Sequence, residues 1–179
     1  KLYGFKKFVI VVPSVAIREG VLKNLQITHE HFQSLYDKTS INFDIYDSKK
    51  VSNLRGFSSG NAIQVLVINI DSFAKDENII NKPNDKLTGK KPIEFIQSTK
   101  PIVIVDEPQN METGIRKKAI QNLEPLCTLR YSATHTNLYN LMYSLNPVKA
   151  YDLGLVKQIE VDSVMSENDF NDSFIQLES

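Results

Sequence analysis

The stretch PIVIVDEPQ, residues 101–109, decides the fold class, because an apolar run of strand-forming residues ends there in two adjacent carboxylates. Similar runs occur upstream as FVIVV at 8–12 and QVLVINI at 64–70, and another apolar stretch follows at 126–131. Continuous rather than alternating apolar residues favour strands that are buried on both faces, as in a parallel sheet covered by helices. The sequence therefore predicts an α/β fold with a mainly parallel sheet and helices on both faces.

The segments between these runs are compatible with helices, loops and two further strands. Apolar residues recur near helical spacing in three segments, which are 15–25, 111–123 and 138–145. Two more segments have the composition of strands, 42–46 and 156–161. Two polar stretches with glycine or proline are expected as loops, 52–61 and 75–91.

Composition and charge indicate one soluble globular domain. The chain has 179 residues, of which 41% are hydrophobic and 23% charged, and the net charge is zero. The charge is uneven, because no Lys or Arg follows Lys157, and the region through Lys157 has 21 basic against 15 acidic residues. That positive body permits a polyanionic partner. With no signal or membrane-span pattern and a single cysteine, Cys127, expected as a packed core thiol, a cytoplasmic protein is predicted.

Asp106 and Glu107 are the first candidates for chemistry. Side chains at the carboxyl end of a parallel strand project into the crevice where open α/β sheets bind ligands. A nucleotide hydrolase needs one acidic group there to hold Mg²⁺ and another to orient water. The alternative is that Asp106 caps the next helix and Glu107 is solvated. The sequence YSATH at 131–135, at the end of the next predicted strand, favours the first interpretation.

A strand that ends in DE, followed about 25 residues later by a strand that ends in SAT, resembles motifs II and III of superfamily-2 helicases and translocases. VPSVAIREGV at 12–21 resembles motif Ia of that superfamily. More specifically, five blocks are similar to the helicase-like core of the Res subunit of type III restriction-modification enzymes: VVPSVAIREGVLKNL, INIDSF, VDEPQNM, LRYSATH and YDLGLVKQIEV. The resemblance extends from about residue 5 to residue 161 and implies a partial RecA-like domain.

The resemblance assigns roles to the residues of motifs II and III. It implies that Asp106 is the Mg²⁺ partner, through water, and that Glu107 is the carboxylate that activates the attacking water. Gln109 is expected to sense the nucleotide. Ser132 and Thr134 are expected to couple the nucleotide site to the rest of the motor, through hydrogen bonds toward the motif II turn.

The same resemblance implies a DNA-binding face. Ser14 would present hydroxyl and backbone N–H donors to a phosphate at the start of the motif Ia helix. Arg18 could also reach a phosphate, and a salt bridge on its own helix is the alternative. Asp71 and Ser72 occupy the position of motif Ib and are weaker candidates.

One motif of a helicase core is missing from the chain. The phosphate-binding pattern G-x-x-x-x-G-K-[ST] does not occur, and the resemblance places it before Lys1. We therefore expect residues 1–161 to be a partial first RecA-like domain lacking the phosphate-binding-loop strand, and 162–179 to be an acidic linker toward a second RecA-like domain. On this hypothesis the chain alone is inactive and binds no cofactor tightly.

The full-length enzyme is expected to use ATP and Mg²⁺, to bind double-stranded DNA, and to couple ATP hydrolysis to DNA cleavage. Its implied partners are a modification (methyltransferase) subunit and, in the same chain, the second RecA-like domain and a nuclease domain. Two alternatives stay open at the level of sequence. One is a generic superfamily-2 DNA helicase or repair translocase, and the other is a degenerate interaction module that hydrolyses nothing.

Overall fold

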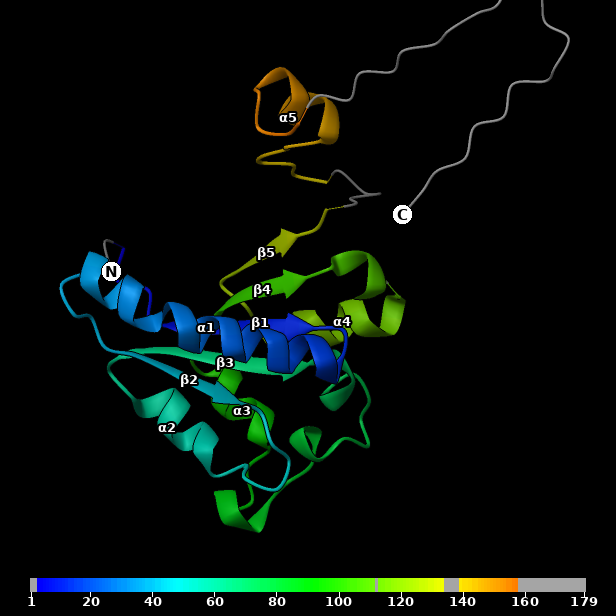
Figure 1. Cartoon of the computed structure of the whole chain (residues 1–179). Helices are drawn as coiled ribbons and strands as arrows, with labels where there is room; N and C mark the ends of the chain where they lie inside the picture. The colour runs from blue at the N-terminus through cyan, green and yellow to red at the C-terminus, as the bar shows by residue number, and fades with distance from the viewer. Residues whose placement is uncertain (1–2, 112, 134–138, 158–179) are drawn as a thin grey trace, which may run out of the picture. The chain divides into compact units, whose positions relative to one another are not determined.

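The computed structural model describes residues 3–111, 113–133 and 139–157. Its centre is a five-stranded sheet in the order β2-β3-β1-β4-β5, in which every pairing is parallel (Figure 1). The strands are β1 (Lys7–Val12), β2 (Ile41–Ile45), β3 (Ile63–Asn69), β4 (Ile102–Asp106) and β5 (Cys127–Tyr131). The predicted α/β class and parallel sheet are confirmed, as is the strand predicted at 42–46.

Helices and short 3₁₀ turns connect the strands. The α-helices are α1 (Val15–Leu35), α2 (Asn53–Ser59), α3 (Pro92–Gln97), α4 (Gly114–Asn122) and α5 (Pro147–Asp152). The 3₁₀ turns are η1 (Ile70–Ser72), η2 (Ile79–Asn81), η3 (Asp85–Leu87) and η4 (Pro108–Met111). None of the helices in the described part of the chain is long and apolar enough to cross a membrane.

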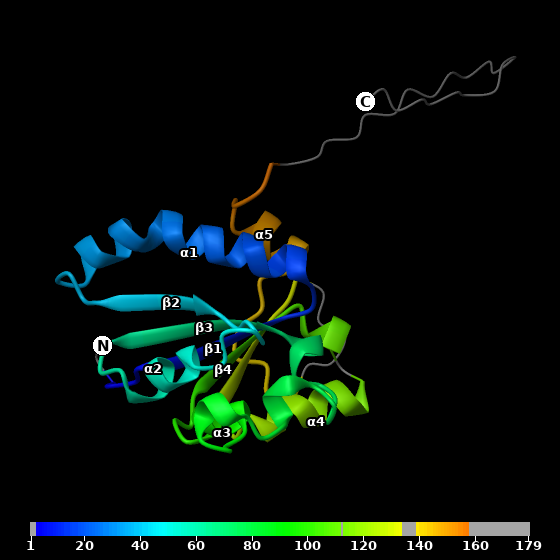
Figure 2. The same cartoon turned by 90° about the horizontal axis from the view of Figure 1, so that it is seen from below.

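Helices cover both faces of the sheet. Helix α1 lies along one face and contacts β1, β2 and β3, whereas α2, α3 and α4 lie on the other face (Figure 2). The second face holds the main core, in which alternate residues of the central strands meet side chains of these three helices. Val9, Val11, Val103 and Val105 are strand members of this core, and each is at most 2% exposed. The core fixes the positions of the strand ends, where the candidate site lies.

Strand β5 departs from the expectation of strands buried on both faces. It is the edge strand next to β4, and its five side chains are exposed or half-buried. Cys127, at its start, is exposed, so the expected core thiol is wrong. An apolar run at the sheet edge looks the same in sequence as one in the centre, because periodicity does not report strand order.

Three other sequence expectations need correction. Residues 52–61, expected as a loop, contain α2, because Leu54 and Phe57 pack into the core despite the helix-weakening residues around them. The expected helix at 138–145 is absent over residues 139–145, and residue 138 lies outside the described residues. Residues 156 and 157 form no strand, and the remainder of the expected strand at 156–161 also lies outside them.

The chain divides into two units, residues Lys1–Leu138 and Tyr139–Ser179. In the second unit, the side chain of Asn146 caps α5 by accepting a hydrogen bond from the Lys149 N–H at 2.8 Å. The helix ends at Asp152 with Leu153 as its C-cap, and Gly154 follows with a φ of +66°, a conformation that glycine adopts without steric cost. This turn accounts for the glycine of the YDLG sequence.

Candidate functional site

The carboxyl ends of the parallel strands bring the candidate residues to one edge of the sheet. Asp106 ends β4 and pairs in register with Tyr131, the last residue of β5. Val12 ends β1 and pairs with Asn69, the last residue of β3. The sequence-predicted site residues that the structure describes are Asp106 itself and residues of the segments that follow these four strands. Ligands of open α/β sheets bind at this edge.

Glu107 stands in an uncommon backbone conformation directly after β4. Its φ is +53°, in the left-handed region that residues other than glycine seldom adopt. The Glu107 N–H donates to the Tyr131 carbonyl at 3.0 Å, and the Glu107 carbonyl accepts from the Asn110 N–H at 3.1 Å. Pro108 follows and disfavours a right-handed helical conformation at Glu107. The chain thus makes a sharp turn held from both sides, and such turns concentrate at functional sites.

A polar cluster joins the ends of β4 and β5. The amide Nε2 of Gln109 donates to Oε2 of Glu107. The Ser132 hydroxyl donates to Oε1 of Gln109 at 2.8 Å and lies 3.5 Å from Oε2 of Glu107. Three of the predicted motif II and III residues are therefore in contact, although they come from two strand ends. Their coupling role stays a prediction, and Thr134 lies outside the described residues.

Asp106 is half-buried beside this cluster. Burial raises the pKa of its carboxyl above the ordinary value, the charge of Glu107 raises it further, and a hydrogen bond from the Glu107 backbone opposes the shift. The ionised carboxylate is thus held in a place where its charge is poorly solvated. A cation at this place would relieve that cost.

The motif Ia segment caps a helix. Ser14 is the N-cap of α1, and its Oγ accepts a hydrogen bond from the Ile17 N–H at 3.3 Å. The first turn of α1 has no acidic residue, so no carboxylate there offsets the partial positive charge of the helix N-terminus. Arg18, one turn on, forms an ion pair with Glu19 at 2.7 Å. The structure therefore shows the salt bridge that was the alternative for Arg18, and its DNA contact stays a prediction.

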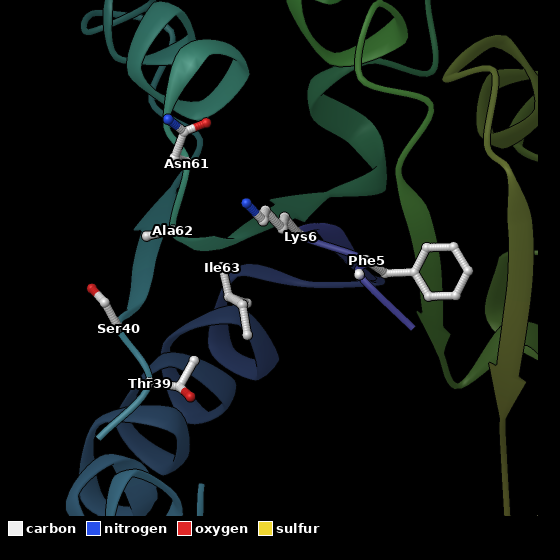
Figure 3. Close-up of a pocket in the computed structure, with 8 residues that line it drawn as sticks. Phe5, Lys6, Thr39, Ser40, Asn61, Ala62 and Ile63 are labelled. Atoms are coloured by element: carbon white, nitrogen blue, oxygen red, sulfur yellow. The ribbon is translucent and has the colours of Figure 1, made fainter. Parts of the chain in front are cut away.

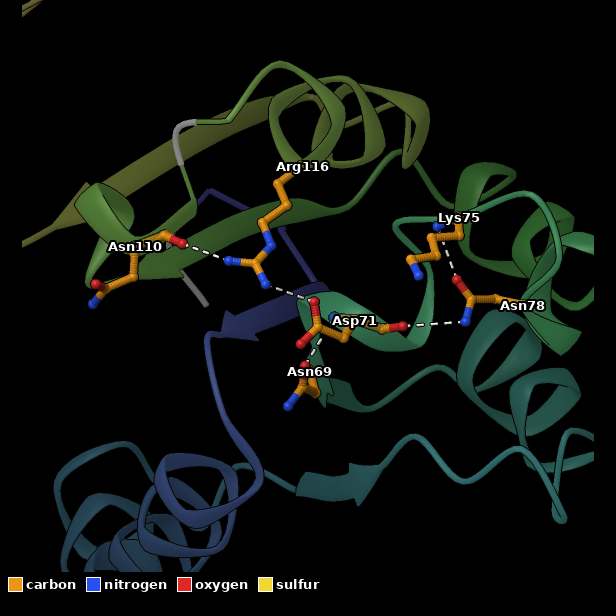
Figure 4. A network of polar contacts seen from close by, with 6 residues as sticks. All are labelled: Asn69, Asp71, Lys75, Asn78, Asn110 and Arg116. Atoms are coloured by element: carbon orange, nitrogen blue, oxygen red, sulfur yellow. Dashed lines mark hydrogen bonds and ion pairs between the residues drawn. The ribbon is translucent and has the colours of Figure 1, made fainter.

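The motif Ib segment is fixed by polar contacts (Figure 4). Asn69 is buried and accepts the Asp71 N–H at 2.8 Å. The carboxylate of Asp71 forms an ion pair with Arg116 of α4 at 2.8 Å, and Ser72 is half-buried. Sequence reasoning missed Arg116, because no pattern relates it to Asp71, a residue 45 positions away.

A family model matches most of the chain. The model of the family described as "Type III restriction enzyme, res subunit" matches residues 1–137. The chain belongs to this family. This is the family that the five sequence blocks resemble, and it has a helicase-like core.

Three curated relatives in the Res-subunit family match the chain. They are the Res subunits of the type III restriction-modification enzymes StyLTI of Salmonella typhimurium, EcoP15I of Escherichia coli and EcoPI of Escherichia phage P1. The identity is 27% for StyLTI and 29% for the other two, over 89% of this chain. The match covers 20% of the StyLTI subunit and 18% of each of the other two. The chain thus spans about a fifth of the length of these relatives.

The donors in this Res-family chain fit a hard cation such as Mg²⁺. Asp106 and Glu107 supply carboxylate oxygens at one strand end, and Mg²⁺ in proteins commonly takes one or two carboxylates and keeps several waters. No group of three or more His, Cys, Asp or Glu that could hold a metal occurs within residues 3–111, 113–133 and 139–157. The pair therefore fits a cation that is shared with water and substrate oxygens better than a closed protein cage.

A pocket of about 290 Å³ lies at the opposite edge of the sheet (Figure 3). Its lining comes from the segments that precede β1, β2 and β3 and from the first residue of β3, and it includes Lys6, Ser40 and Asn61. It contains no carboxylate and none of the candidate residues. The candidate residues lie instead at the carboxyl edge, where the polar groups converge.

Proposed function

We propose that this chain is part of the ATP-driven DNA motor of a type III restriction endonuclease, in which ATP hydrolysis is coupled to DNA cleavage. The observation that carries the proposal is the contact of Glu107, Gln109 and Ser132 at the carboxyl edge of the sheet. A carboxylate that must hold and direct a water molecule needs a fixed orientation.

Asp106 and Glu107 take different roles in this proposal. Asp106 holds Mg²⁺ through water, which fits its poorly solvated carboxyl. Mg²⁺ and ATP, when bound, supply the phosphoryl group and neutralise its developing charge. Glu107 accepts a proton from the attacking water at a carboxylate oxygen. The left-handed turn and the Gln109 amide hold that carboxylate in place.

Gln109 and Ser132 link the nucleotide site to the rest of the motor. Gln109 bridges Glu107 and Ser132, so a shift of either strand end changes the hydrogen bonds of the other. We assign Gln109 to nucleotide sensing and Ser132 to coupling, and extend the coupling role to Thr134 from the family resemblance.

DNA binding is assigned to the segments that follow β1 and β3. The N-terminus of α1 offers backbone N–H groups and the Ser14 hydroxyl, which suit a phosphate oxygen. Arg18 adds a positive charge one turn later. Ser72 and Asp71 lie after β3, the strand beside β1, on the same sheet edge.

The proposal extends to the full-length enzyme. Residues 1–161 would be part of its first RecA-like domain and 162–179 a linker, and the partners would be double-stranded DNA, a modification subunit and the second RecA-like and nuclease domains. We place this enzyme in the cytoplasm. The 179 residues hold no phosphate-binding-loop pattern, so on their own they should not hydrolyse ATP.

Nucleotide binding by Asp106→Asn in the full-length enzyme tests the proposal. The substitution removes the charge that attracts the hydrated cation, so affinity for ATP should fall in the presence of Mg²⁺ and change little in its absence. Titration with a fluorescent ATP analogue, with and without Mg²⁺, measures both. Asp76→Asn, an exposed acidic residue elsewhere in the same chain, is the matched control. Unchanged Mg²⁺-dependent affinity in Asp106→Asn would contradict the assignment.

A further inference from the structure

Arg116 connects two segments to which we assign different ligands. Its Nη2 donates to Oδ1 of Asp71 at 2.8 Å, in the segment after β3. Its Nη1 donates to the carbonyl of Asn110 at 2.8 Å, in the turn after β4 (Figure 4). One guanidinium thus bridges the two segments with two of its nitrogens, which the flat fork of arginine permits and the point charge of lysine does not.

Both ends of this bridge are attached to fixed backbone. The Asn110 N–H donates to the Glu107 carbonyl at 3.1 Å, so the carbonyl that Arg116 holds belongs to the turn that carries Glu107. On the other side, Asn69 holds the Asp71 N–H at 2.8 Å, and Asn78 donates to the Asp71 carbonyl at 3.1 Å. Displacement of the η1 segment can therefore reach the Glu107 turn through the Arg116 side chain.

Fold stability does not explain an arginine at this place. Arg116 lies in the first turn of α4, the end of the helix dipole that disfavours a cation. Its ion pair is solvated, because the Asp71 side chain is 62% exposed and that of Arg116 is 33% exposed. Such pairs stabilise a fold little. The contacts with Asp71 and Asn110, rather than stabilisation of α4, therefore explain why this residue is an arginine.

The ion pair also changes what Asp71 can do. A free carboxylate in a segment that faces DNA would repel phosphate, and Arg116 neutralises it. A phosphate that approaches this segment would compete with Asp71 for the guanidinium and so act on the same side chain that holds the Asn110 carbonyl.

We propose that Arg116 is a positioning residue that couples DNA binding at the η1 segment to the orientation of the Glu107 turn. This inference rests on the proposed function, and it names a residue outside motifs Ia, Ib, II and III. The coupling would be carried by Asp71, Arg116 and the Asn110 carbonyl in series.

The test uses the full-length enzyme with its modification subunit. For each variant, the ATP turnover with saturating DNA is divided by the turnover without DNA, and the DNA Kd and thermal unfolding are measured in parallel. Arg116→Ala should lower this ratio by about fivefold or more, the lower range of coupling between sites, with the unfolding temperature little changed. The DNA Kd should rise, because Asp71 is then no longer neutralised, and saturating DNA removes that effect from the ratio. Lys118→Ala is the matched control, because Lys118 is an exposed cation of the same helix.

Two further variants separate coupling from stability and from charge. Arg116→Lys keeps the charge and loses the fork, so its ratio should stay low. Asp71→Asn combined with Arg116→Ala should lower the ratio no further than Arg116→Ala does alone, because the residues act in series. If Arg116→Ala destabilises the enzyme, the turnover ratio of Arg116→Lys is the test of the inference.

A wild-type ratio in Arg116→Ala or Arg116→Lys would overturn the inference, as would additive losses in the double variant. Failure of the proposed function would differ from this result, because Glu107→Gln would then hydrolyse ATP normally. A Glu107→Gln enzyme without turnover, together with a wild-type ratio in Arg116→Ala, would reject the role of Arg116 alone.

Discussion

Removal of the Ser132 hydroxyl should weaken the link between the ends of β4 and β5 without unfolding the chain. In Ser132→Ala the 2.8 Å hydrogen bond to Oε1 of Gln109 is lost, and no larger group is introduced. Glu107 keeps the hydrogen bond from Gln109 Nε2, so the general base stays in place but its support is reduced. The expected defect is therefore in turnover and is moderate.

The magnitude follows from the hydrogen bonds that are lost. One neutral hydrogen bond contributes about 1 kcal/mol, which corresponds to roughly a fivefold lower DNA-stimulated turnover in Ser132→Ala. Gln109→Ala also removes the bond to the Glu107 carboxylate, and bonds to charged groups contribute about 1.5–3 kcal/mol. Its loss should therefore be larger, roughly ten- to a hundredfold. Because Ser132 acts through Gln109, the double variant should resemble Gln109→Ala.

The assay is steady-state ATP turnover of the full-length enzyme at saturating DNA, with kcat and KM fitted separately. Ser34→Ala is the matched control, because its hydroxyl donates within α1, to the His31 carbonyl at 2.7 Å. It should have wild-type turnover. The reasoning would be refuted if Ser132→Ala had wild-type kcat, or if the losses in Ser132→Ala and Gln109→Ala multiplied in the double variant.

Three further predictions concern stability and exposure. The folded-state pKa of Asp106 is raised, so the folded chain binds this proton more tightly than the unfolded chain, and stability falls as pH rises through the folded pKa. Asp106→Asn should accordingly raise the unfolding temperature at neutral pH and lose that advantage in acid; an advantage that grows in acid would contradict the sign. Cys127 should react with a thiol reagent in the native chain, and a requirement for denaturant would restore the core-thiol expectation. Phe73 is 2% exposed, so Phe73→Ala should lower the free energy of unfolding by about 3–5 kcal/mol in a denaturant titration, and a loss below 1 kcal/mol would contradict its core position.

The sequence predicts the fold where one short-range signal dominates. The runs at 8–12 and 64–70 are strands because their continuous apolar residues are buried between two helical layers. Helix α2 was missed, since Gly56 and the serines around it weaken helical propensity and only packing of Leu54 and Phe57 compensates. Residues 138–145 have the apolar spacing of a helix. A short helix also needs a neighbouring surface to pack against, and the spacing alone does not guarantee one.

In the candidate site, too, the local sequence predicts some contacts and the packing of the whole fold sets the others. The DE and SAT patterns predict that Glu107 and Ser132 lie at the same edge of the sheet, because both follow parallel strands. Their contact also requires that β4 and β5 are neighbours, which the structure shows. The ion pair between Asp71 and Arg116 depends on how α4 lies against η1. That packing is set by the whole core, and residue spacing does not encode it.

Glu107→Gln in the full-length enzyme tests the central claim most directly, because it removes the proton acceptor and nearly preserves shape. The measurement follows ATP turnover, DNA retardation on a gel and DNA cleavage in one preparation, with Glu94→Gln, an exposed residue of α3, as the matched control. We predict that turnover falls by roughly two to four orders of magnitude, the usual size of a general-base contribution, while DNA is retarded but left uncut. Near wild-type hydrolysis and cleavage by Glu107→Gln would show that Glu107 is only a solvated residue after a strand, and the motif II assignment would be wrong.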